Sequence, residues 1–158
     1  MENIIKNALK NSFTYNEYRQ LFETLVKEQR TTGDLQTEEK IAFTKLNHSR
    51  MKRWEKTYQP AYNFAKANPD EAEIWLIIVE AWCGDAAQNV PVLNKIAEQM
   101  PDVELRLVLR DDNPELMDRF LTNGSKSIPK LIRLQKSNLE VLGTWGARPA
   151  AAAHLLAE

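Results

Sequence analysis

A run of apolar, mostly β-branched or aliphatic residues near the middle of the chain limits the folds available to it. The run is Ile74-Trp75-Leu76-Ile77-Ile78-Val79, with a glutamate on either side. A strand without polar residues in alternation is typical of the centre of a sheet covered on both faces. The run is far too short to cross a bilayer as a helix. We therefore expect a layered α/β fold with this strand at its centre.

Strand and helix patterns alternate from Glu73 onward, giving the order βαβαββα. Pro91 lies inside the first of these helices, and Pro114 begins the second at its first turn. Strands separated by a helix favour a parallel pair, whereas two strands joined by a short polar turn favour an antiparallel hairpin. The expected elements are strands at 74–79, 103–109, 130–135 and 139–143 and helices at 86–100, 114–121 and 150–158.

The first seventy residues carry helix signals and no strand signal. Thr14 and Glu17 form a capping-box pattern for a helix to residue 29, and Thr37 begins a second helix that extends toward residue 58. The inward residues expected on the second helix are Ile41, Ala42, Leu46 and Trp54. We therefore divide the chain into an α-helical N-terminal extension, residues 1–72, and a sheet domain, residues 73–158.

Composition narrows the range of partners. The chain has 158 residues, with 21 Lys and Arg against 22 Asp and Glu, so its net charge is −1. No overall field directs it toward nucleic acid or an anionic membrane, and we expect neither as a partner. One Cys and two distant His residues do not support a zinc site, and no glycine-rich phosphate loop is present, so no metal or other cofactor is expected.

The single cysteine also bears on the compartment. One Cys cannot form an intramolecular disulfide, which points away from a disulfide-stabilised secreted fold. Residues 1–6 lack a basic region followed by a long apolar stretch, so no signal peptide is expected. We expect a cytoplasmic protein whose oligomeric state the sequence does not indicate.

The only cysteine follows the central strand at the start of a helix, in Trp82-Cys83-Gly84-Asp85-Ala86. Free N–H groups and the helix dipole favour a thiolate at such a position. The carboxylate of Asp85 has the opposite effect, because it disfavours a second negative charge nearby. The residues alone leave open which effect prevails.

These residues resemble the thioredoxin family over residues 73–158. The family places Trp-Cys-Gly-Pro-Cys at a helix start and a proline eight residues after the first Cys, and here Pro91 follows Cys83 by eight residues (91 − 83). Asp112-Asn113-Pro114 and Ser127-Ile128-Pro129 also match. The resemblance implies a thioredoxin-like fold. It also implies a cis peptide bond before Pro129, with the backbone of Ile128 facing the thiol.

The sequence departs from the family pattern at three positions. Ala86 stands where the family has its resolving Cys, and Asp85 stands in place of the intervening Pro. Ile77 stands where the family has a buried Asp that assists proton transfer. An internal dithiol cycle is therefore not available to this chain.

Two functions remain open on these grounds. In the first, Cys83 performs monothiol exchange with a protein or a low-molecular-weight thiol or disulfide. The mixed disulfide that forms is then released by an external thiol. In the second, Cys83 is an inert buried residue, and a groove around Trp82, Cys83 and Pro129 binds a protein, so that the chain is a redox-inactive adaptor. A third outcome is dimerisation through a Cys83–Cys83 bridge. The predicted substrate-binding residues around the catalytic candidate Cys83 are Trp82, Gly84, Asp85, Ile128 and Pro129.

The second helix also carries a basic stretch. Its members are His48, Arg50, Lys52, Arg53 and Lys56. Such a stretch could meet an acidic partner, but acidic residues are interleaved with it at 38, 39 and 55. We interpret it as a solvated face.

Overall fold

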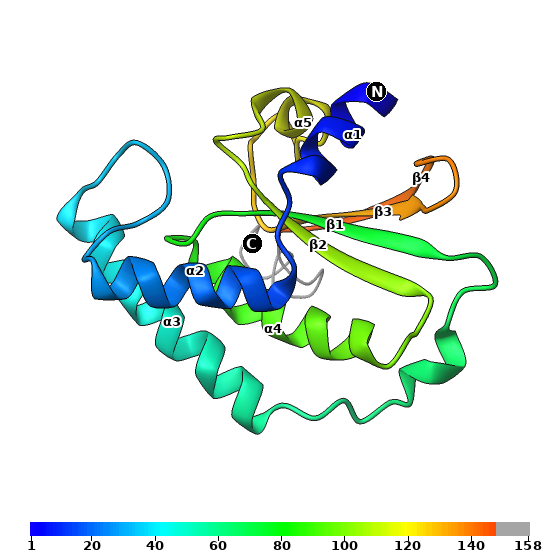
Figure 1. Cartoon of the computed structure of the whole chain (residues 1–158), viewed down its shortest axis with the longest axis horizontal. Helices are drawn as coiled ribbons and strands as arrows, with labels where there is room; N and C mark the ends of the chain where they lie inside the picture. The colour runs from blue at the N-terminus through cyan, green and yellow to red at the C-terminus, as the bar shows by residue number, and fades with distance from the viewer. Residues whose placement is uncertain (148–158) are drawn as a thin grey trace.

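A four-stranded sheet forms the centre of the molecule (Figure 1). The computed structural model describes residues 1–147 of the chain. The strand order is β2-β1-β3-β4. The strands are β1 Glu73–Val79, β2 Val103–Leu109, β3 Lys130–Gln135 and β4 Val141–Gly146. All four predicted strands are therefore present, although β4 begins two residues later than expected (141 − 139).

The parallel pairing of β1 with β2 and the antiparallel hairpin of β3 and β4 follow the prediction, whereas the pairing of β1 with β3 was not predicted. β1 is parallel to β2 and antiparallel to β3, and β3 is antiparallel to β4. Ile77, at the middle of β1, lies opposite Leu107 of β2 and Leu131 of β3 and has no exposed surface. The apolar run is a central strand because its side chains are covered on both faces.

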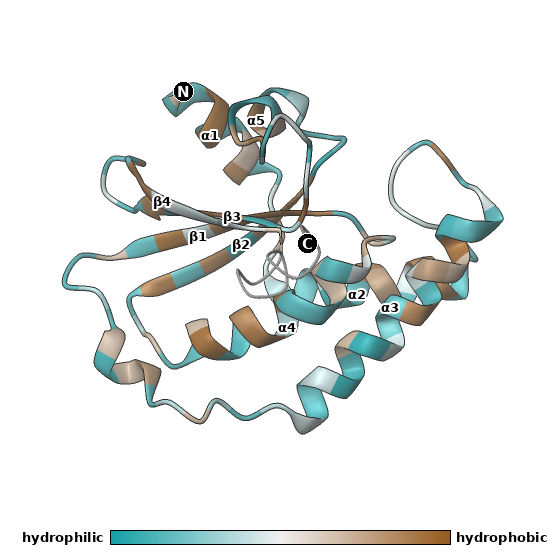
Figure 2. Ribbon diagram, turned by 180° about the vertical axis from the view of Figure 1, so that it is seen from behind, coloured by the Kyte–Doolittle hydropathy of each residue, from teal (hydrophilic) through white to brown (hydrophobic). Residues whose placement is uncertain are grey.

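Helices cover both faces of the sheet (Figures 1 and 2). On one side lie α2 Tyr15–Lys27, α3 Glu38–Thr57 and α4 Gly84–Glu98. On the other lie α1 Glu2–Lys10, which the sequence analysis did not predict, and α5 Pro114–Arg119. A 3-10 helix, η1 Phe64–Ala67, precedes β1. The predicted final helix, 150–158, lies outside the described residues.

The N-terminal helices share one hydrophobic core with the sheet. Ile5 of α1, Phe22 of α2 and Met51 of α3 are buried in the same cluster as the side chains of β1. Phe13 makes two backbone hydrogen bonds with Leu107 of β2, with N···O distances of 2.7 and 2.8 Å. Residues 1–57 therefore supply much of the cover for the sheet.

The caps of the two N-terminal helices match the sequence. Thr14 and Glu17 form the reciprocal capping box at the start of α2. Thr37 caps α3 by accepting a hydrogen bond from the backbone N–H of Lys40. These local signals were sufficient because each cap is completed within four residues of chain.

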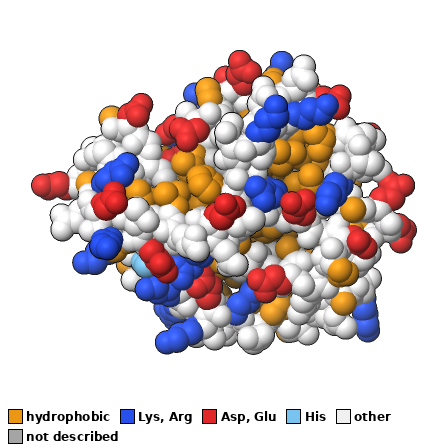
Figure 3. Space-filling model, viewed as in Figure 1, with side chains coloured by type: hydrophobic (Ala, Val, Ile, Leu, Met, Phe, Trp, Pro, Cys, Tyr) orange, Lys and Arg blue, Asp and Glu red, His pale blue; other side chains and the backbone are white. Residues whose placement is uncertain are grey.

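The prediction for the inward face of α3 was wrong. Ala42 and Leu46 are exposed, and Ile41 and Trp54 are only partly buried. The buried residues of α3 are Thr44, Asn47, His48 and Met51. His48, expected on a solvated basic face, stacks on Phe22 with ring centroids 6.1 Å apart. Figure 3 shows Lys and Arg side chains gathered over α3 with Asp and Glu side chains between them.

Candidate functional site

The thiol of Cys83 lies between a helix start and the loop before β3. Cys83 is the N-cap of α4, and its Sγ accepts a hydrogen bond from the backbone N–H of Ala86 at 3.4 Å. The same thiol donates to the carbonyl oxygen of Ile128 at 3.5 Å. The peptide bond between Ile128 and Pro129 is cis. The side chain is largely enclosed, since the residue is only 9% exposed.

Burial controls the acidity of this thiol. Loss of hydration raises the pKa of Cys83 above its ordinary value, and the charge of Asp85 raises it further. The N–H of Ala86 and the guanidinium of Arg110 act in the opposite direction and lower that pKa, but less strongly. Of the two effects weighed from the sequence, the helix-terminal N–H acts on this pKa more strongly than the charge of Asp85, but burial outweighs both, so the thiol is mostly protonated at neutral pH.

Trp82 stands beside the thiol and contacts two cations. The ammonium of Lys40, from the start of α3, lies 4.3 Å from the ring centroid. The guanidinium carbon of Arg110, directly after β2, lies 5.0 Å from it. Contacts of this kind attract a cation to the negative face of the ring. The indole is thus held by side chains from two distant segments.

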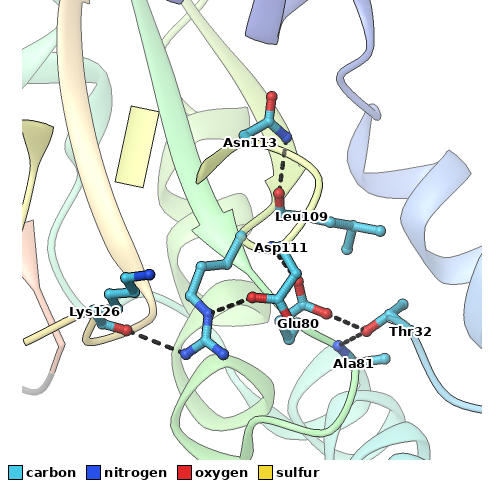
Figure 4. Close-up of polar contacts among 8 residues, drawn as sticks. Thr32, Glu80, Ala81, Leu109, Asp111, Asn113 and Lys126 are labelled. Carbon is cyan, nitrogen blue, oxygen red and sulfur yellow. Dashed lines mark hydrogen bonds and ion pairs between the residues drawn. The ribbon is translucent and has the colours of Figure 1, made fainter. Parts of the chain in front are cut away.

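A buried carboxylate organises the backbone before Cys83 (Figure 4). Glu80 is 1% exposed, and its Oε1 accepts a hydrogen bond from the hydroxyl of Thr32 at 2.6 Å. Its Oε2 accepts from the backbone N–H of Asp111 at 3.0 Å. The Thr32 hydroxyl oxygen in turn accepts from the N–H of Ala81 at 3.0 Å. Burial raises the pKa of Glu80, and these hydrogen bonds oppose that rise.

A second set of contacts reaches the same turn from α3. Asn47 donates through Nδ2 to the carbonyl oxygen of Ala81 at 2.9 Å. Its Oδ1 accepts from Nη1 of Arg50 at 3.0 Å. A Cβ on Gly84 would also lie 3.0 Å from that Nη1. Glycine at position 84 therefore leaves the room that the guanidinium occupies.

The structure brings several of the predicted site residues together. Cys83 faces Ile128. Trp82 and Gly84 flank the cysteine in the chain, and Asp85 lies in the first turn of α4. Pro129 is buried next to Ile128. Their roles in catalysis or binding stay predictions.

Sequence reasoning missed the residues that hold the turn in place. They are Thr32, Lys40, Asn47, Glu80 and Arg110. One signal was available for Glu80, because a carboxylate between a buried strand and Trp82-Cys83 must either leave the core or find hydrogen-bond donors. The others act across long stretches of chain and carry no local signature.

Within residues 1–147, no three His, Cys, Asp or Glu side chains cluster so that they could hold a metal ion. No helix in this part of the chain combines the length and the apolar character needed to cross a membrane.

Comparison with known proteins identifies the family. The sequence model described as Thioredoxin matches residues 34–158. A Streptomyces coelicolor (strain ATCC BAA-471 / A3(2) / M145) protein named "Putative thioredoxin 2" is 33% identical over 90 residues, covering 57% of this chain and 64% of that protein. The chain belongs to the thioredoxin family.

Two solved structures share the fold. A protein of unknown function from Pseudomonas aeruginosa superposes with a TM-score of 0.56 at 17% identity, covering 90% of this chain and 81% of its own. An HIV epitope-scaffold gives a TM-score of 0.55 at 18% identity, covering 89% of this chain and 81% of its own. At these identities the likeness concerns the fold alone.

Proposed function

We propose that the protein carries out monothiol exchange through Cys83 with a disulfide of a protein or of a small molecule. The observation that carries the proposal is the position of Sγ, between the N–H of Ala86 and the carbonyl oxygen of Ile128. A donor at 3.4 Å is placed to stabilise negative charge on the sulfur once the proton leaves. The backbone around Ile128 and Pro129 is the groove along which an extended segment of the partner would lie.

The exchange is a balanced substitution at sulfur. The Cys83 thiolate attacks one sulfur of the partner disulfide, a new Sγ–S bond forms, and the old S–S bond breaks with the second sulfur leaving as a thiolate. Because Ala86 cannot attack the mixed disulfide, an external thiol must release the product. A protein recycled by external thiols suits a reducing compartment, and cytoplasm is part of the proposal on that ground.

The proposal is tested by following mixed-disulfide formation with an uncharged disulfide by intact mass spectrometry across pH. Burial raises the pKa of Cys83, and only the thiolate reacts. We therefore expect the rate to keep increasing with pH until the pH exceeds the ordinary pKa of a cysteine thiol. Cys83→Ser is the control and should gain no mass. A folded protein that stays unmodified at every pH, while the same chain reacts in denaturant, would contradict the proposal.

The enclosure of the thiol favours one alternative, a redox-inactive adaptor. A residue that is 9% exposed, with a raised pKa, is a poor nucleophile at neutral pH. In that case the groove formed by Trp82 and Pro129 binds a protein without chemistry. Capture of partners with Cys83→Ser distinguishes the two functions. If the protein is an adaptor, the variant still binds the partner; if it is an exchanger, the variant no longer forms the covalent adduct.

A further inference from the structure

A cationic cavity lies between α3 and α4, next to the turn that carries Cys83. Its volume is about 550 Å³. Its polar lining comes mainly from Ser49, Arg50 and Arg53 of α3 and from Gln88 of α4, with the indole of Trp54 beside them. None of these side chains was assigned a role in the proposed exchange.

The two guanidinium groups of the cavity lack acidic partners in the described part of the chain. Within residues 1–147, neither Arg50 nor Arg53 makes an ion pair. The nearby acid of α3, Glu55, accepts a hydrogen bond from the hydroxyl of Tyr15 and forms an ion pair with Arg19, both of α2. The cavity therefore keeps two positive charges, and the planar donors of arginine suit a carboxylate.

Other contacts prepare the cavity for an anion. The indole N–H of Trp54 donates to Oε1 of Gln88 at 2.6 Å, so the amide N–H groups of Gln88 remain as donors. Arg50 is held by its hydrogen bond to Asn47, which limits the freedom that binding would cost. Arg50 and Gln88 are thus positioned by other side chains, and donors already in position favour a ligand of matching charge.

One side chain of the cavity, Arg50, approaches the residue that follows Cys83. Nη1 of Arg50 lies 3.0 Å from the Cβ position of Gly84. Gln88 lies one helical turn further along the same face of α4, roughly 6 Å along the axis. Arg50 therefore belongs both to the lining of the cavity and to the surroundings of the turn that carries Cys83.

We propose that this cavity binds a carboxylate of the disulfide with which Cys83 exchanges, so that the substrates are acidic disulfides. The inference rests on the proposed function. Arg53 and Gln88 bind the carboxylate, and Arg50 binds it while also holding Asn47 against Ala81. The thiolate then attacks the sulfur nearer the bound end, and the other half leaves as a thiolate.

The test compares two disulfides of the same shape, dithiodibutyrate and its uncharged diamide, by the rate of adduct formation on Cys83. Arg53→Gln should slow the reaction with dithiodibutyrate about fivefold and leave the reaction with the diamide unchanged. Lys45→Gln is the matched control, since Lys45 is an exposed cation of α3 outside the lining of this cavity. It should alter neither rate.

A second measurement separates the site from the chemistry. Sebacate, a sulfur-free dicarboxylate of the same length as dithiodibutyrate, should bind Cys83→Ser in an NMR titration and lose that binding with Arg53→Gln. Equal rates with both disulfides, unaffected by Arg53→Gln, overturn the inference and leave the exchange itself intact. No adduct with either disulfide, with sebacate still bound, overturns the exchange and the substrate assignment.

Discussion

The two segments that enclose the site, β1 and α3, are built on opposite principles. From Leu76 to Val79 the buried side chains of β1 are hydrocarbon, and the strand is hydrogen-bonded to a neighbouring strand on both sides. Along α3 three of the four buried residues are polar, and Figure 2 draws most of this helix as hydrophilic. The strand is stabilised mainly by removing apolar surface from water, whereas the helix is positioned by individual hydrogen bonds.

The difference follows from what each segment faces. β1 lies between β2 and β3 at the centre of the sheet, and its side chains from Leu76 to Val79 are fully buried in the hydrophobic core. The inner face of α3 meets polar groups of two loops. Asn47 donates to the backbone carbonyl oxygen of Ala81, and the hydroxyl of Thr44 hydrogen-bonds to the hydroxyl of Thr31. A polar helix face is therefore the means by which the turn before Cys83 is held.

The largest expected effect comes from a substitution in the apolar core of β1. Ile77→Ala should lower the free energy of unfolding by about 3 kcal/mol, because it leaves a cavity in a fully buried strand. Urea unfolding followed by circular dichroism measures the change. Ile77→Val, which removes one methylene group, is the control at about 1 kcal/mol. An equal loss for the two variants would contradict the account of β1.

The next effect comes from removing the buried carboxylate. Glu80→Ala leaves the Thr32 hydroxyl and the N–H of Asp111 without their acceptor, and we expect a loss of about 2 kcal/mol. Unlike Ile77→Ala, it should also increase the rate at which a neutral alkylating reagent modifies Cys83 under native conditions. Asp118→Ala, in an exposed position of α5, is the matched control. An unchanged alkylation rate would show that Glu80 does not hold the turn.

A smaller effect is expected at α3. Asn47→Ala removes the donor to the carbonyl oxygen of Ala81 and the acceptor of Arg50, at a cost of about 1 kcal/mol. Ser49→Ala, on the exposed side of the same helix, should change stability little. Denaturant titration of both variants checks the prediction. An equal loss in both variants would contradict a role for the hydrogen bonds of Asn47, because alanine has the higher helix propensity at both positions.

The smallest effect is a pH dependence at His48. Burial lowers the pKa of His48, and the nearby charges of Lys52 and Arg19 lower it further. The unfolded chain then binds more protons than the folded one, so stability should fall as pH drops below about 6.5 toward the lower pKa of the folded state. Unfolding at pH 7 and pH 5 measures this loss. His48→Gln should reduce it, and an unchanged loss would assign it to other groups.

Much of the fold was predictable because its signals are local. The apolar run of β1, the cap at Thr14 and Pro114 at the start of α5 each depend on neighbours in the chain. The inward face of α3 was not predictable from hydrophobic periodicity. Asn47 is buried because of an oxygen 34 residues away, and no pattern within the helix encodes that partner.

The candidate site was likewise predictable only in part. The position of Cys83 at the start of α4 followed from the strand and helix patterns, and its approach to Ile128 followed from the family resemblance. The sign of the pKa shift did not follow, because it depends on how much solvent the folded chain excludes. The cavity at Arg50 and Arg53 required two helices to be placed side by side.

The contact of Trp82 with Lys40 and Arg110 has a spectroscopic consequence. The emission of an indole shifts with the charges around its ring, so Trp82 should act as an internal fluorophore for events at the neighbouring sulfur. The chain has four tryptophans. Replacing Trp54, Trp75 and Trp145 by phenylalanine leaves a single tryptophan beside the single cysteine, and its emission would report attachment and release without an added dye.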